Sequence, residues 1–170
     1  MDETSVKHTD GKQSHPSALE TTTLKRREIQ SPLFASLMGG FIKEVGYEKA
    51  MEVASTAFKK DAILSGKIMA EKFSGNSMNE MVRILKEVWA EEDALEYTIF
   101  EQTDKRFSFD VTRCRYAELY ERLGIQEFGC VLSCDRDTPF IKSFNPCMKL
   151  IRTQTIMQGA TLCDFRIVLE

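Results

Sequence analysis

The feature that most constrains the fold is a change in the spacing of apolar residues near the middle of the chain. In the first half, apolar residues recur at three- and four-residue intervals, as Leu33 and Leu37 do, which is typical of helices with one buried side. In the second half, Phe107, Phe109 and Val111 alternate with other residues, as on a strand with one buried face. Helices followed by strands with short helices between them predict a single-domain α+β fold with an antiparallel sheet.

Turn and capping signals divide the helical half into three helices. Gly46 separates the first helix from a second, which is predicted over residues 47–72. Ser77 followed three residues later by Glu80 predicts a capping box at the start of the third. Pro32 should kink or interrupt the first helix, because proline lacks a backbone N–H and clashes with the preceding turn.

The second half is predicted to alternate strands with short elements. A helix is expected over residues 116–123, a short helix over 128–132 and a loop over 135–144. Strands are expected over residues 95–100, 107–111, 148–156 and 163–169.

The first residues differ in composition from the rest. They are polar, lack aromatic residues and contain both histidines, His8 and His15, so a disordered and dispensable tail is expected. The remaining chain is long enough for one domain with its own core. The predicted organisation is a tail over residues 1–15 and one domain over 16–170, with a helical half at 16–92 and a sheet-and-site half at 93–170.

Composition excludes several functional classes. The net charge of -3 gives no basic surface for nucleic acid, and the short cluster Lys25-Arg26-Arg27 is interpreted as a solvated helix face. No apolar run has the roughly twenty residues needed to span a bilayer, and the polar N-terminus has no apolar h-region, so it is not expected to be a signal peptide. A cytoplasmic location is expected, where all five cysteines would remain thiols.

The cysteines lie in the last third of the chain, away from the histidines. Cys114 is predicted at a strand-to-helix junction beside Arg113, and both features favour the thiolate form. Cys163 precedes a carboxylate, whereas Cys130 and Cys147 are interpreted as packing residues. With no histidine in the folded part and no C-x-x-C pair, neither a metal site nor a cofactor is predicted.

Two carboxylates carry the other candidate chemistry. Asp164 lies in a predicted apolar strand and therefore needs a partner, for which Arg152 on the neighbouring predicted strand is the expected residue. Asp137 lies in the predicted loop near Cys134. Thr153 and Thr155 should share one face of their strand, by its two-residue period.

The order of these motifs resembles the L-2-amino-thiazoline-4-carboxylic acid hydrolase family. The resemblance covers roughly residues 24–166 and is sharpest from Val111 onward. It is carried by T-R-C-x-Y-A-E, C-x-x-D, F-N-P, R-T-Q-T-x-x-x-G-A and C-D-F-R, which correspond to Thr112, Arg113, Cys114, Tyr116, Cys134, Asp137, Phe144, Asn145, Pro146, Arg152, Thr153, Thr155, Gly159, Cys163, Asp164 and Phe165.

This resemblance implies a hydrolase that opens a cyclic amidine or isothiourea, such as 2-amino-thiazoline-4-carboxylate, to N-carbamoyl-cysteine. An aspartate-activated water or a thiolate would attack the ring carbon between sulfur and the nitrogens, and the residues leave both nucleophiles open. The expected catalytic residues are Cys114, Cys163, Asp137 and Asp164. The expected substrate-binding residues are Arg113, Arg152, Asn145, Tyr116, Cys134 and Thr153.

Two other functions fit the same sequence. In the first, the charged pairs hold a small zwitterion without turnover, and the thiols belong to the core. In the second, the helical half mediates self-association, giving a homo-oligomer. A small-molecule ligand is the principal partner expected, with no nucleic acid and no membrane.

Overall fold

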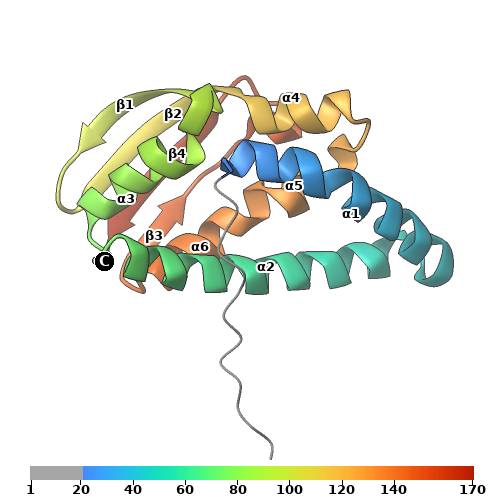
Figure 1. The fold of residues 1–170 in the computed structure, drawn as a ribbon. Coiled ribbons are helices and arrows are strands. Elements are labelled where there is room, and N and C mark those ends of the chain that lie inside the picture. The colour runs from blue at the N-terminus through green and yellow to red at the C-terminus, as the bar shows by residue number, and fades with distance from the viewer. Residues whose placement is uncertain (1–20) are drawn as a thin grey trace, which may run out of the picture.

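Two long helices form the first part of the computed structural model, which describes residues 21–170 (Figure 1). α1 (Thr23–Val45) and α2 (Tyr47–Lys72) form an antiparallel hairpin whose closed end lies far from the sheet. Gly46 makes the reversal with φ at +83°, a left-handed conformation that glycine adopts without steric cost. The predicted tail lies outside the described residues.

α1 is continuous through Pro32, so the predicted interruption is wrong. The proline lies on the exposed side of the helix, where a carbonyl freed from the helical ladder can bind water. Ser31 and Met38 are buried and hold the helix against the domain around the proline. At its start, the Thr22 side chain accepts a hydrogen bond from the N–H of Lys25.

α3 (Met78–Ile84) begins with the predicted capping box. Glu80 accepts a hydrogen bond from the N–H of Ser77 at 2.9 Å, and the Ser77 hydroxyl accepts one from the N–H of Asn79 at 3.2 Å. The helix passes directly into one π-helical turn over Leu85–Trp89. Such turns widen a helix locally and recur at functional sites.

The second half contains a four-stranded sheet with the order β1-β2-β4-β3. Every neighbouring pair is antiparallel, as the alternation predicted. The helices before it and this sheet make an α+β domain (Figure 1). The strands are β1 (Leu95–Gln102), β2 (Arg106–Cys114), β3 (Met148–Ile151) and β4 (Cys163–Leu169).

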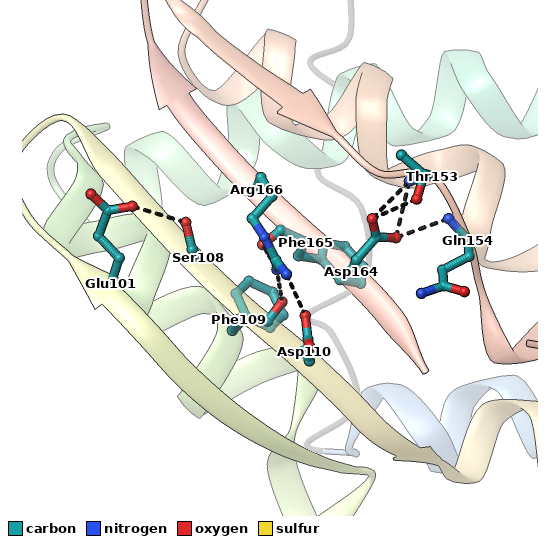
Figure 2. A network of polar contacts seen from close by, with 9 residues as sticks. All are labelled: Glu101, Ser108, Phe109, Asp110, Thr153, Gln154, Asp164, Phe165 and Arg166. Atoms are coloured by element: carbon teal, nitrogen blue, oxygen red, sulfur yellow. Dashed lines mark hydrogen bonds and ion pairs between the residues drawn. The ribbon is translucent and has the colours of Figure 1, made fainter. Parts of the chain in front are cut away.

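The two faces of the sheet have opposite character. On the inner face, the Phe109 and Phe165 rings stack with centroids 4.7 Å apart, and Phe107 lies against Phe109. Side chains from α3 and α6 complete this core. On the outer face, the intervening residues of the same strands carry polar side chains, including Asp110 and Arg166 (Figure 2).

Short helices connect the strands. They are α4 (Arg115–Arg122), α5 (Gly129–Leu132) and α6 (Asp137–Phe144), with 3-10 turns at Gln126–Phe128, Cys134–Arg136 and Ile156–Gln158.

α6 corrects the loop predicted over residues 135–144. Pro139 lies in the first turn of this helix, where its missing N–H would have had no helical partner. α6 packs so closely on α2 at Gly66 that a Cβ atom at this position would lie 2.4 Å from the Phe140 carbonyl oxygen. A helix rather than a loop therefore carries Asp137.

β3 is shorter than predicted and ends at Ile151. Asp164 explains this end, since its carboxylate accepts hydrogen bonds from the N–H groups of Thr153 and Gln154 at 3.0 and 2.8 Å. These donors are bound by a side chain and do not continue the strand ladder. Thr153 and Thr155 consequently do not share a strand face, as the sequence had suggested.

Candidate functional site

A cavity of about 180 Å³ lies between the inner face of the sheet and the α1–α2 hairpin. Aromatic rings form much of its wall: Trp89 from the π-helical turn, Phe140 from α6 and Phe165 from β4. The Trp89 ring lies edge-on to Phe140, with centroids 5.4 Å apart. The polar groups that enter this wall come from distant parts of the chain: Cys114, Tyr116, Cys134, Asp137, Arg152 and Cys163, with Arg26, Arg27 and Arg136.

An ion pair between Asp137 and Arg152 provides the charged centre of the cavity. Asp137 is the first residue of α6, and Arg152 directly follows β3, so a helix start and a strand end bring them together. Arg152 donates one hydrogen bond to the Asp137 carboxylate and another to the Cys134 carbonyl oxygen at 3.0 Å. Its guanidinium also lies over the Phe165 ring, 5.0 Å from the centroid. The pair is held from several sides.

Burial determines the acidity of Asp137. Its side chain is 20% exposed. Removal from solvent raises the pKa of Asp137 to about 6, and this effect outweighs the opposing attraction of Arg152. A carboxylate with a pKa near the working pH is suited to accept and return a proton.

Cys114 and Cys163 line the same cavity, as the sequence predicted. Cys114 ends β2 and caps α4, and Cys163 begins β4. Burial raises the pKa of Cys114 to about 11, despite hydrogen bonds from the N–H groups of Ala117 and Tyr116. Burial also raises the pKa of Cys163, whose sulfur accepts a hydrogen bond from Ile156. Both groups are thus thiols at neutral pH, which corrects the predicted thiolate at Cys114.

Cys134 forms a thiol pair with Cys130. A hydrogen bond from the Cys134 thiol lowers the pKa of Cys130, and the same bond together with burial raises the pKa of Cys134. Of these two, only Cys134 contributes to the cavity wall.

Tyr116 holds the π-helical turn in place. Its hydroxyl donates a hydrogen bond to the Trp89 carbonyl oxygen at 3.0 Å, and burial raises its pKa. The residue lies in the first turn of α4, two residues after Cys114. Tyr116 therefore joins α4, which begins directly after Cys114, to the turn that carries Trp89.

The remaining four predicted site residues lie outside the cavity. Asp164 is on the outer face of the sheet, where Thr153 and Gln154 donate to it (Figure 2), and the predicted Asp164–Arg152 pair is wrong. Arg113 forms exposed ion pairs with Glu96 and Glu118.

Asn145 has a structural position in a turn. It donates to the Asn76 carbonyl oxygen and accepts from the N–H of Cys147 at 2.9 Å. This links the start of β3 to the turn after α2. Thr153 is engaged with Asp164 and does not face the cavity.

The sequence did not identify three arginines of the cavity wall, Arg26, Arg27 and Arg136. Arg27 belongs to the basic cluster that was interpreted as solvated. Arg136 lies between two aspartates and was treated as part of a loop, yet it pairs with Asp61 of α2 at 2.5 Å. The signal that would have distinguished Arg27 is its helical phase, since it falls three and four residues before Gln30 and the buried Ser31.

Residues 21–170 contain neither a membrane-spanning helix nor a cluster of metal ligands. No helix in this range is long and apolar enough to cross a bilayer. In the same range, no three or more histidine, cysteine or acidic side chains come together as metal ligands would.

Solved structures with a similar fold include those of two other proteins. One is the phenol-responsive sensory domain of the transcription activator PoxR with phenol, at a TM-score of 0.51 and 11% identity, covering 81% of this chain and 73% of that one. Another is a trafficking protein particle complex subunit 3 from Naegleria fowleri covalently bound to palmitic acid, at a TM-score of 0.50 and 9% identity, covering 86% and 96%. At such identities, the likeness concerns the fold alone.

Sequence comparison gives the family. No curated protein matches the chain. The model of the family described as L-2-amino-thiazoline-4-carboxylic acid hydrolase matches residues 26–167, which include both the helical hairpin and the sheet. The chain therefore belongs to the L-2-amino-thiazoline-4-carboxylic acid hydrolase family.

Proposed function

We propose that the protein hydrolyses a small cyclic amidine or isothiourea, such as 2-amino-thiazoline-4-carboxylate, within this cavity. The observation that carries the proposal is Asp137, a carboxylate in an apolar cavity whose pKa is raised to about 6 by burial. Family membership supplies the substrate class, and the buried carboxylate supplies a base suited to neutral pH.

In the proposed reaction, Asp137 takes a proton from water, and the water oxygen bonds to the ring carbon between sulfur and the nitrogens. The bond from that carbon to sulfur then breaks. Of the two water protons, one ends on the ring nitrogen and the other on the departing sulfur, with Asp137 returning the proton that it accepted. The product is N-carbamoyl-cysteine, which equals the substrate plus one water.

Arg152 has a positioning role in this mechanism. Its bonds to the Asp137 carboxylate and to the Cys134 carbonyl oxygen fix the carboxylate relative to the aromatic wall. The positive charge also keeps Asp137 ionised at a lower pH than burial alone would allow. Arg152 is thus assigned to the base, and not to the substrate carboxylate as the sequence suggested.

The raised pKa values of Cys114 and Cys163 favour water over a thiolate as the nucleophile. A protonated thiol is a poor nucleophile but a weak hydrogen-bond donor, and either thiol is placed to donate to the departing sulfur. A covalent adduct on Cys114 or Cys163, detected by mass spectrometry of the intact protein during turnover, would instead assign the thiolate route.

A non-catalytic binding module is the second candidate. Two observations favour it: the cavity wall is largely aromatic, and both similar structures contain an organic molecule, phenol in one and palmitic acid in the other. In that case the Asp137–Arg152 pair would bind the ligand without consuming it. The two candidates differ in whether product exceeds the amount of protein.

The deciding experiment incubates the protein with excess 2-amino-thiazoline-4-carboxylate and measures N-carbamoyl-cysteine by mass spectrometry. Many product molecules per protein molecule are expected. Asp137→Asn should reduce the rate about 100-fold or more, the usual contribution of a general base. Asp135→Asn is the matched control, because Asp135 is exposed two residues away, and it should keep the rate. Product limited to one equivalent, or none, would favour the binding module.

A further inference from the structure

The cavity continues into a cleft between α1 and α2. This cleft has a volume of about 480 Å³ and shares Thr23, Arg26, Arg27, Ser65 and Arg136 with the cavity wall. The shared residues mark it as the opening through which a ligand reaches Asp137. Its charges therefore act on any ligand before and during binding.

Positive charge exceeds negative charge in this opening. Arginines at four positions line the cavity and the cleft, namely Arg26, Arg27, Arg136 and Arg152, against carboxylates at Asp61 and Asp137. Each of the carboxylates is already engaged by an arginine: Asp61 by Arg136 at 2.5 Å, and Asp137 by Arg152. Arg136 is also bound to the Phe58 carbonyl oxygen at 3.2 Å.

Arg27 is left without such a partner. Among residues 21–170, no carboxylate lies within ion-pair distance of its guanidinium, and no carbonyl or hydroxyl oxygen there accepts a hydrogen bond from it. The neighbouring Arg26 differs, since it is exposed and in contact with the Thr21 carbonyl oxygen. Burial lowers the pKa of Arg27, which reflects the cost of holding this charge away from water.

The groups that face Arg27 cannot neutralise it. They are the hydroxyls of Tyr116 and Tyr120, the guanidinium of Arg136 and the carboxylate of Asp61, which Arg136 occupies. The Tyr116 hydroxyl donates to Trp89, and the Tyr120 hydroxyl is bound to Ser133. A half-buried guanidinium in this setting is suited to receive an anion from outside the protein.

We infer that Arg27 binds the carboxylate of the ligand in the cavity whose wall also contains Asp137. The ligand is then a small molecule that carries a carboxylate at the α1–α2 opening and its reacting carbon at the Asp137 end. The inference deepens the proposed function by assigning the anionic part of the substrate to the helical half. It is separable from the proposed function, because binding of the carboxylate does not require turnover.

The first test is ligand-free and measures unfolding by denaturant at pH 7. If Arg27 awaits an external anion, Arg27→Met removes an unpaired charge and should leave the unfolding midpoint unchanged or raise it. Arg136→Met is the control; it removes an arginine that binds Asp61 and the Phe58 carbonyl oxygen and lies over the Phe58 ring, and loss of these contacts should lower the midpoint. A lowered midpoint for Arg27→Met would overturn the inference, since Arg27 would then have a partner within the chain.

The second test compares two probes by calorimetry: 2-amino-thiazoline-4-carboxylate and 2-amino-thiazoline, which lacks the carboxylate. The wild type should bind the first about tenfold to a hundredfold more tightly, as charge-assisted bonds do. Arg27→Gln should remove this preference, whereas Lys25→Gln, an exposed position on the same helix outside the cavity and the cleft, should retain it. Equal binding of both probes by the wild type, or a preference that survives in Arg27→Gln, would overturn the inference even if turnover is observed. A lost preference without any turnover would leave it standing while the proposed function fails.

Discussion

Asp137 and Asp164 each follow a cysteine closely in sequence, but they lie on opposite sides of the sheet. Asp137 faces the cavity and pairs there with Arg152, and burial raises its pKa to about 6. Asp164 lies on the outer face of the sheet; its burial is outweighed by hydrogen bonds from Thr153 and Gln154, which lower its pKa (Figure 2). The surroundings of each aspartate therefore determine what it can do. Asp137 is suited to exchange protons, and Asp164 is suited to bind the backbone of the segment after β3.

The largest expected effect is a difference in turnover between variants of these two aspartates. Asp137→Asn should reduce kcat by about 100-fold or more, because the amide cannot accept the proton from water. Asp164→Asn should leave kcat close to the wild-type value, since Asp164 does not face the cavity. Steady-state kinetics with 2-amino-thiazoline-4-carboxylate measures both. If Asp164→Asn were the more damaging change, the outer face would have to contain the reacting group.

A smaller effect concerns the pH profile. Since Asp137 must be ionised to act as a base, kcat/KM should fall as the pH drops through about 6. Arg152 favours the ionised form, so Arg152→Met should move this fall to higher pH by about one unit. Arg152→Lys retains the charge and should move it less. An acid limb that stays in place in Arg152→Met would show that Asp137 is not the titrating group.

The two aspartates also differ in how much of their structural surroundings could be predicted from the sequence. The three long or capped helices and the bounds of β4 followed from spacing, Gly46 and the Ser77 capping box. By the two-residue period of a strand, Cys163 and Asp164 had to face opposite sides, so the sequence already contained the reason to separate them. By the same two-residue period, the adjacent residues Arg113 and Cys114 had to face opposite sides of their strand.

Other parts of the site depended on contacts that spacing does not encode. Arg152 pairs with Asp137 because α6 begins at that residue, and the helix was hidden by Pro139 and by the polar residues before it. Arg27 was assigned to solvent because a cluster of basic residues on a helix is usually exposed. Which side of α1 meets the domain is decided by the packing of α2 and α4, far away in sequence.

A modest effect on stability is expected for Asp164. Asp164→Asn should lower the free energy of unfolding at pH 7 by about 1 kcal/mol, because the amide accepts fewer and weaker hydrogen bonds. The lowered pKa means that this contribution is present above the ordinary aspartate pKa and is lost as the pH falls through the lowered value. Urea unfolding at pH 7 and in acid measures it, with the exposed Asp104→Asn as control. A difference that persists unchanged in acid would contradict the assignment.

The smallest expected effect lies on the outer side of α1. Ile29, Leu33, Leu37, Phe41 and Val45 recur every four residues and are 51% to 68% exposed. Leu37→Gln should therefore leave the unfolding temperature of the monomer unchanged, unlike Met38→Gln at the buried neighbouring position.

The same row provides a test of the self-association hypothesis. If a second copy covers it, sedimentation at increasing concentration should show a dimer in the wild type that Leu37→Gln weakens. A monomer at every concentration would exclude that use of the row.

The most direct test of the central claim is the titration of Asp137 itself. Carbon-13 NMR of aspartate carboxyl groups, with the Asp137 signal identified by its absence in Asp137→Asn, gives its pKa in the ligand-free protein. A midpoint near 6, well above that of Asp164, is the predicted result. A midpoint for Asp137 at or below about 4, the ordinary aspartate value, would contradict the assignment of Asp137 as the base.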